Sequence, residues 1–245
     1  MDQLLSSFNN LSGMTPEKMF KMNDYGPDVQ KHLANVYLAL VACVMTTAVG
    51  VGVSMQYNLG GGWLGLIGTF GMLFWIQMDT KKEEIARRLM MLCGFGFFQG
   101  ISISPLISAA FAIDPAIIMS AVIGTVTVFA CFSLAAISSK RRSYLYLGGL
   151  LASAITVMCV LSLLNIFFRS INVYLFQLYG GLLVFSGYVI FDTQLILEKA
   201  DQGNRDVIGH ALELFIDFMA LLVRILIILM RNSKNDKKSK KSNQR

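Results

Sequence analysis

Seven apolar segments constrain what this chain can fold into. About 20 residues of α-helix cross the roughly 30 Å hydrocarbon core of a bilayer. The segments run over residues 33–55, from the Gly60-Gly61-Gly62 turn to residue 78, and over 89–113, 116–137, 144–168, 171–197 and 207–230. Only 15% of the residues are charged, against about 25% in a typical soluble domain. We therefore predict an all-α membrane protein, a seven-helix transmembrane bundle.

Polar residues flank the predicted bundle at both ends. We expect a cytosolic polar N-terminal segment over residues 1–32, a transmembrane domain over 33–230 and a basic C-terminal tail over 231–245. The basic residues of the tail are Arg231, Lys234, Lys237, Lys238, Lys240, Lys241 and Arg245. We interpret this tail as a solvated, flexible end near anionic lipid rather than as a nucleic-acid-binding segment.

The loop charges predict an orientation. Lys and Arg accumulate before the first segment and in the loops after the second, fourth and sixth. The positive-inside rule assigns these parts to the cytosol. The basic tail also favours the cytosol, but seven crossings place it on the other side. Either the last segment re-enters the membrane and returns to the cytosolic face, or the tail is translocated despite its charge.

The last two segments each carry an aspartate, Asp192 and Asp217, on either side of a polar turn at Gly203 and Asn204. If the two helices fold back antiparallel, the nearly equal spacing from the turn places both carboxylates at one depth on facing helices. Ionisable groups inside a membrane indicate a functional site. Two such acids repel each other when both are charged, which favours a shared proton. The pair could sense pH, bind a hard cation such as Ca²⁺ or act as an acid–base dyad.

The last segment also carries a polar stripe. At about 100° per residue its members share an arc of about 60°. They are Asp206, His210, Glu213, Asp217 and Arg224. This arc predicts that the stripe faces another helix, a water-filled cavity or an ion path rather than lipid.

Each of these residues also has a simpler interpretation. The first three members of the stripe could be solvated residues of the cytosolic interface. A structural salt bridge with Arg224 or another basic residue would account for Asp217, and a helix end in the headgroup region would account for Asp192. His32 is a single histidine at the start of a helix, and we interpret it as solvated.

Intramembrane aspartyl proteases also place two aspartates on adjacent spans, in Tyr-Asp and Gly-x-Gly-Asp motifs. Here the contexts are Phe191-Asp192 and Ile216-Asp217, with no glycine before the second aspartate. His210 and Glu213 are spaced as two metal ligands one turn apart, which is weak support for a metal site. Phosphate-binding and HExxH motifs are missing from the sequence. We therefore predict no enzyme, no metal centre and no cofactor.

Three motifs resemble those of the Bax inhibitor family, above all its animal members. They are Arg141-Arg142-Ser143-Tyr144-Leu145, Gly187-Tyr188-Val189-Ile190-Phe191-Asp192-Thr193-Gln194-Leu195-Ile196 and Leu214-Phe215-Ile216-Asp217-Phe218. The second motif is long and specific, and the resemblance extends over nearly the whole chain.

The resemblance implies a seven-helix fold with the last helix central and residence in the endoplasmic reticulum membrane. It also implies a pH-dependent Ca²⁺ leak, suppression of apoptosis, and contact with Bcl-2-type proteins and stress sensors. The paired aspartates of the family match Asp192 and Asp217, the expected ion path and pH sensor, with His210, Glu213 and Arg224 as supporting residues. In bacterial relatives an arginine near the end of the second span closes over the pair. Here that place reads Met78-Asp79-Thr80-Lys81-Lys82, with arginines only at Arg87 and Arg88, so the equivalent residue is not assigned.

Two hypotheses follow. In the first, the protein is a cation leak channel, with Ca²⁺ as the transported ion and the aspartate pair as its switch. In the second, it is a non-conducting membrane adaptor that binds apoptosis regulators or stress sensors, which the basic tail would suit.

Overall fold

The structure, a computed structural model, consists of α-helices. It describes residues 26–57, 59, 62–79, 84–139 and 144–242. The helices are α3 (Pro27–Tyr57), α4 (Gly62–Met78), α5 (Ile85–Ile113), α6 (Pro115–Ser138), α7 (Leu147–Phe168), α8 (Ile171–Asp201) and α9 (Val207–Ser242). They match the seven predicted segments, so the all-α bundle is confirmed. Residues 1–25 of the predicted N-terminal segment, residues 80–83 after the second segment, the basic loop at 140–143 and residues 243–245 of the tail lie outside the described residues.

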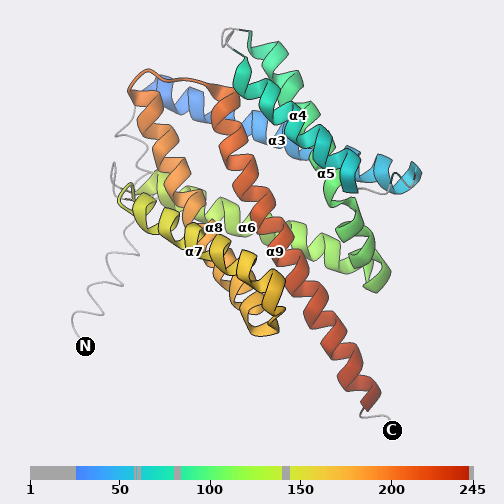
Figure 1. Cartoon of the computed structure of the whole chain (residues 1–245). Helices are drawn as coiled ribbons and strands as arrows, with labels where there is room; N and C mark the ends of the chain where they lie inside the picture. Colours follow the sequence, from blue (N-terminus) through green and yellow to red (C-terminus); the bar gives the residue numbers. More distant parts are fainter. Residues whose placement is uncertain (1–25, 58, 60–61, 80–83, 140–143, 243–245) are drawn as a thin grey trace, which may run out of the picture.

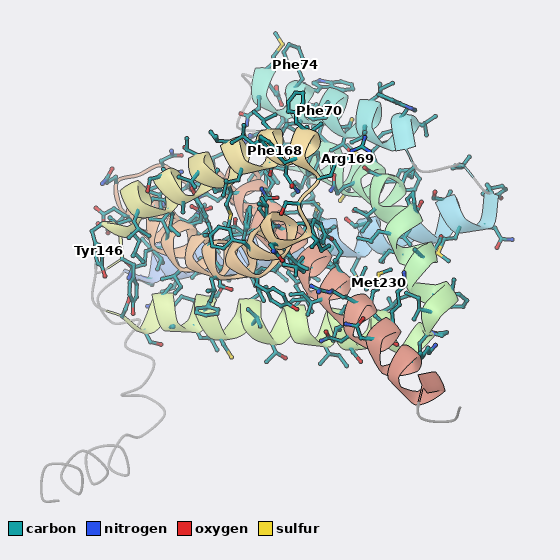
Figure 2. All side chains as sticks on the ribbon, turned by 60° about the horizontal axis from the view of Figure 1, so that its bottom comes forward. Phe70, Phe74, Tyr146, Phe168, Arg169 and Met230 are labelled. Carbon is teal, nitrogen blue, oxygen red and sulfur yellow. The ribbon has the colours of Figure 1, made fainter. Side chains whose placement is uncertain are left out.

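The bundle has the apolar exterior of a membrane protein. In the described part of the chain, α3, α5, α6, α7 and α8 are each long and apolar enough to cross a bilayer. The shorter α4 has 17 residues and is also apolar. Large apolar side chains point outward, among them Phe70 and Phe74 on α4 and Phe168 at the end of α7 (Figure 2). Such an exterior is stable against lipid and not against water, so the chain is a multi-pass membrane protein.

The last helix lies in the middle of the bundle. α9 packs against α3, α5, α6 and α8, and Figure 1 shows it running between the other helices. Its apolar side chains form the core: Phe215 meets Phe95 of α5, and Phe218 meets Phe129 of α6, each edge to face with ring centroids 5.6 Å apart. This position, which the family resemblance implies, is confirmed.

α9 is also longer than the apolar pattern predicts. Its 36 residues form one helix, about 54 Å long at 1.5 Å per residue. Near its end, the Lys237 ammonium donates to the carbonyl of Ile113 at the end of α5, at 2.6 Å. A re-entrant segment would need a turn, and α9 has none between Val207 and Ser242. The tail up to Ser242 therefore continues the helix, contrary to the flexible end that we expected.

Short polar turns connect the helices closely. Asp114 caps α6, its carboxylate accepting from the backbone N–H of Ala116 at 2.9 Å, and Pro115 takes the first helical position. α7 ends at Arg169, which adopts a left-handed conformation with φ 48° and donates its N–H to the Asn165 carbonyl. These turns bring α6 back into contact with α5 and α8 back into contact with α7.

Candidate functional site

The site is built on the hairpin of α8 and α9. Gly203 turns the chain with φ 94°, a conformation that costs glycine little. The N–H of Gly203 donates to the Ala200 carbonyl at 3.1 Å, and that of Asn204 donates to the Lys199 carbonyl at 2.9 Å. Both bonds satisfy carbonyls at the end of α8. Within the first two turns of each helix from this hairpin turn, Lys199 of α8 bonds Glu213 of α9 at 3.0 Å, which sets the register of the two helices.

Deeper in the hairpin, the two aspartates meet. The carboxyl groups of Asp192 on α8 and Asp217 on α9 lie close enough to interact with each other. A carboxylate only accepts hydrogen bonds, so the two groups can bond each other only when one of them carries a proton. Asp217 is buried, with 4% of its surface exposed, whereas Asp192 is partly exposed. The geometry expected from the turn is therefore present, and the role of the pair as ion path and pH sensor stays a prediction.

The surroundings of the pair leave part of it unsatisfied. Oδ2 of Asp217 is buried and has no hydrogen-bond partner among the described residues. Tyr188 and Glu213, each one turn away on one of the two helices, interact electrostatically with both aspartates. In the described part of the chain, no three His, Cys, Asp or Glu side chains gather to hold a metal ion. The pair therefore has one oxygen that no described residue satisfies.

His210 is not solvated. Its Nδ1 lies 2.9 Å from Nε2 of His32 on α3, and the two rings meet edge to face. Only 2% of His210 and 5% of His32 is exposed. Our interpretation of His32 as a solvated residue is therefore wrong: the first turns of α3 pack on α9, and the histidines satisfy each other there.

Asp206, at the start of α9, forms a buried ion pair that the sequence did not indicate. Its two carboxylate oxygens lie 2.5 Å and 3.1 Å from the guanidinium of Arg88 on α5, and Arg88 is 4% exposed. Oδ1 of Asp206 also accepts the N–H of Gly209, which caps the helix. The other arginine considered above, Arg87, pairs with Asp79 and Glu84. Each arginine thus has an acidic partner outside the aspartate pair.

Arg224 lies on the same polar stripe of α9, but it contacts an aromatic ring and a backbone carbonyl rather than an acid. Its guanidinium carbon lies 4.2 Å from the centre of the Phe185 ring of α8, and Nη1 donates to the Ala220 carbonyl at 2.9 Å. Gly181 makes room for it, because a Cβ at that position would meet the guanidinium. None of the ion pairs among the described residues joins Arg224 to Asp217, so the salt-bridge interpretation of Asp217 is not supported.

Gln194 explains part of the long motif around Asp192. Its side-chain oxygen accepts the N–H of Tyr144 at 2.7 Å, and its nitrogen donates to Ser139 and to the Ala136 carbonyl. These bonds fix α8 to the end of α6 and the start of α7, half a helical turn beyond the aspartate. The motif therefore holds the α8 side of the pair in place.

Comparison with known proteins supports these motifs over most of the chain. Residues 29–234 match the family described as "Inhibitor of apoptosis-promoting Bax1". The chain is 40% identical to "Probable Bax inhibitor 1" of Paralichthys olivaceus over 227 residues, 92% of this chain and 96% of that protein. It is 38% identical to "Bax inhibitor 1" of Homo sapiens with the same coverage, and 40% identical to that of Arabidopsis thaliana over 95% of both chains. The chain therefore belongs to the Bax inhibitor family.

Proposed function

We propose that this protein is a pH-sensitive Ca²⁺ leak channel of the endoplasmic reticulum membrane that suppresses apoptosis. The names of its relatives support the suppression of apoptosis. The observation that carries the proposal is the close approach of the two carboxyl groups of Asp192 and Asp217 inside the bundle, with Asp217 buried. Oxygen ligands suit Ca²⁺, and buried acids without a basic partner are unusual inside a membrane.

The pair provides a switch because its two protonation states differ in geometry. With one proton between them, the carboxyl groups hold α8 and α9 together. When that proton leaves, two negative charges face each other in a medium of low dielectric constant and repel. A cation that reaches the free oxygen of Asp217 relieves this repulsion. Loss of the proton would therefore open a path that also attracts cations.

Reconstituted flux tests the proposal. We expect the full chain in Ca²⁺-loaded liposomes to leak Ca²⁺ with a rate that changes with pH. Asp217→Asn and Asp192→Asn should change the size of the leak or remove its pH response, because an amide cannot release a proton. Asp201→Asn, which alters an exposed carboxylate at the end of α8, is the matched control. Unchanged flux in both pair variants would contradict the proposal.

The second candidate is a non-conducting adaptor for Bcl-2-type proteins or stress sensors. The basic end of α9 favours it, since Arg231, Lys234 and Lys237 stand on a continuous helix that extends past the end of α5. An ordered basic helix presents charge to an acidic partner at lower entropic cost than a flexible tail. Cells protected by the aspartate variants but not by a chain truncated after Met230 would select the adaptor. The reverse pattern would exclude it.

A further inference from the structure

A groove runs along the first half of α3, on the side that faces the starts of α5 and α9. It has two parts, of about 290 Å³ and about 320 Å³, each near the lower end of the range of roughly 300–1,000 Å³ for small-molecule sites. Asn35 and Val207 line both parts, so the two parts form one continuous groove. Spacings of three and four residues place the α3 lining on one face of that helix. This lining includes Lys31, Asn35, Leu38 and Ala42.

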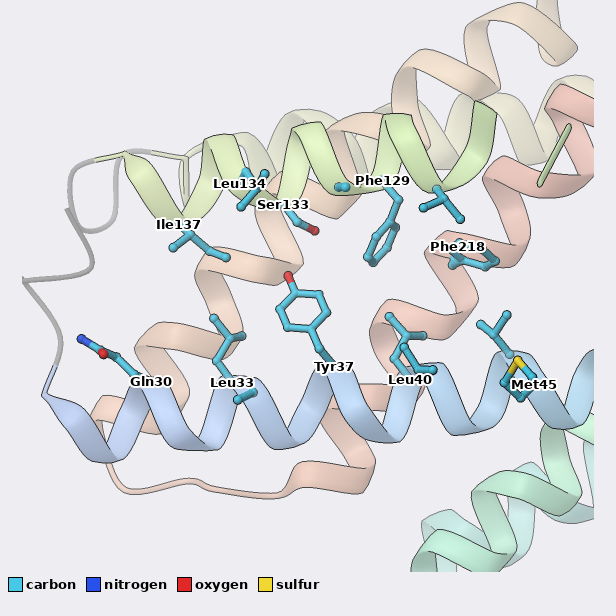
Figure 3. A pocket seen from close by; sticks show the side chains of 15 residues that line it. Gln30, Leu33, Tyr37, Leu40, Met45, Phe129, Ser133, Leu134, Ile137 and Phe218 are labelled. Atoms are coloured by element: carbon cyan, nitrogen blue, oxygen red, sulfur yellow. The ribbon is translucent and has the colours of Figure 1, made fainter. Parts of the chain in front are cut away.

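The groove is separate from the cavity between α3 and α6 that Figure 3 shows. Leu33, Tyr37 and Leu40 point from α3 into that cavity, which measures about 550 Å³ and has a mostly apolar lining. The groove instead has charged side chains at one end, and their chemistry restricts what can occupy it. The cavity of Figure 3 therefore serves as a source of control positions on the same helix.

The end of the groove beside the α8–α9 turn carries an excess of positive charge. Lys31 of α3 and Arg205 of the turn line it together with one acid, Asp28. Arg205 lies 3.5 Å from Asp28, and their side chains are 49% and 74% exposed, so the guanidinium stays accessible to a further anion. Two cations beside one acid favour an occupant with a single negative charge. Phosphate is the anion that arginine and lysine commonly bind.

The other end of the groove is apolar. Its lining includes Leu38, Ala39, Ala42, Ile85, Leu89 and Ile208. Leu38 and Ile85 are 68% and 57% exposed, so this part is open to the acyl chains of the bilayer. From Lys31 to Ala42 the groove extends about 16 Å along α3, at 1.5 Å per residue. A cationic end followed by an apolar end is complementary to a molecule with an anionic headgroup and a hydrocarbon chain.

We propose that this groove binds an anionic phospholipid whose headgroup carries hydroxyl groups and no second charge, the class of phosphatidylinositol. The phosphodiester binds between Lys31 and Arg205, and one acyl chain lies along Leu38 and Ala42. The headgroup hydroxyls donate to the carboxylate of Asp28. A serine headgroup would bring a second carboxylate beside Asp28, and the repulsion disfavours it. The site lies outside the aspartate pair and stands whether or not the protein conducts Ca²⁺.

Photolabelling of the full chain in phosphatidylcholine liposomes tests the site. The probe is a trace of phosphatidylinositol with a photoreactive group in one acyl chain, and the readout is the labelled fraction of the α3 and α5 peptides that line the groove. Lys31→Gln and Arg205→Gln should each reduce this labelling about 2- to 5-fold, as expected for solvent-accessible charge pairs. Ala42→Phe fills the apolar end and should remove the labelling.

Matched variants separate binding from folding and from general attraction to positive charge. Lys234→Gln removes an exposed lysine near the other end of α9, and Ala34→Phe adds the same bulk to α3 in the cavity of Figure 3. Both should label as the unmodified chain does. Each variant is compared at equal folded amount, measured by its thermal unfolding in detergent. If Ala42→Phe fails to fold, Lys31→Gln and Arg205→Gln still test the site, because they alter exposed side chains.

A change at Asp28 tests the choice of headgroup. In the unmodified chain, a photoreactive phosphatidylserine should label the groove less than the inositol lipid does. Asp28→Asn should reduce this difference, because it removes the repulsion between two carboxylates. Glycerophosphoinositol, which has the headgroup without acyl chains, should not displace the lipid probe.

Three outcomes would overturn the proposal. The first is equal labelling of the unmodified chain and of a double variant, Lys31→Gln with Arg205→Gln. The second is labelling by phosphatidylserine equal to that by phosphatidylinositol in the unmodified chain. The third is displacement of the probe by glycerophosphoinositol, which would identify a soluble phosphate ester rather than a lipid as the ligand.

Discussion

The acidic side chains of the α8–α9 hairpin have different partners near the turn, which we call the shallow level, and further along the two helices, which we call the deep level. Near the turn, each acid of α9 has a basic partner: Asp206 has Arg88, and Glu213 has Lys199. One level deeper, Asp217 has another acid, Asp192, and one buried oxygen without a partner. Opposite charges fix a structure, whereas two acids hold together only while they share a proton. From this difference we expect the shallow level to be structural, and the deep level is the part that our proposal requires to change state.

The largest effect should come from breaking the shallow level. Arg88→Met leaves Asp206 partly buried without its arginine, and breaking a buried ion pair costs about 3–5 kcal/mol. We expect a steep loss of thermal stability in detergent. The double variant Arg88→Met with Asp206→Asn, which retains an N-cap residue, should recover much of it. If the single variant were as stable as the unmodified chain, the pair would not be structural.

An intermediate effect should come from the deep level. If the native pair shares a proton, as we propose, the unfolded chain lacks that proton at neutral pH, so this contribution to stability is present at low pH and declines as pH rises. Asp217→Asn forms its bond to Asp192 without a proton. We expect a variant that is more stable by about 1 kcal/mol at high pH and whose unfolding temperature varies less with pH.

Thermal unfolding between mildly acidic and alkaline pH measures this difference. Asp201→Asn, at the exposed end of α8, should follow the unmodified chain throughout. Parallel pH profiles for Asp217→Asn and the unmodified protein would mean that the two carboxyl groups do not share a proton.

The smallest effect should come from the half-exposed pair of the shallow level. The side chains of Lys199 and Glu213 are 30% and 40% exposed, and solvent-accessible ion pairs contribute about 0–1 kcal/mol. Lys199→Met should lower stability by less than about 1 kcal/mol, and salt should weaken the difference. A larger loss in the free energy of unfolding, measured by denaturant titration, would show that this ion pair contributes more to stability than an exposed pair does.

Much of the fold follows from short-range patterns in the sequence. Apolar runs of helical length predicted seven helices, and the structure has a helix at each of them. The meeting of Asp192 and Asp217 was predictable because one short turn joins their helices, so the spacing along the chain determines the depth of each residue. The end of α9 was not, because its last turns lack the apolar pattern by which we recognised the helices.

The partners of the shallow level could not be predicted in the same way. Arg88 and Asp206 lie 118 positions apart, and His32 and His210 lie 178 apart. No periodicity within one helix indicates which distant helix will face it. The one available signal was the polar arc on α9, which shows that partners exist but not which residues they are. An arc of acids and a histidine on a central helix predicts basic or polar residues at matching depth on its neighbours.

The central position of α9 has a consequence for biosynthesis. The segments emerge from the ribosome in order, so α3 and α5 enter the bilayer before the helix that pairs with His32 and Arg88 exists. Until α9 is inserted, these two side chains lack the partners that they have in the folded bundle, and unpaired polar groups inside a membrane are costly. Assembly is therefore completed by the last segment. We expect that a nascent chain that stops before Val207 keeps unpaired polar side chains, which the quality-control machinery of the cell can recognise.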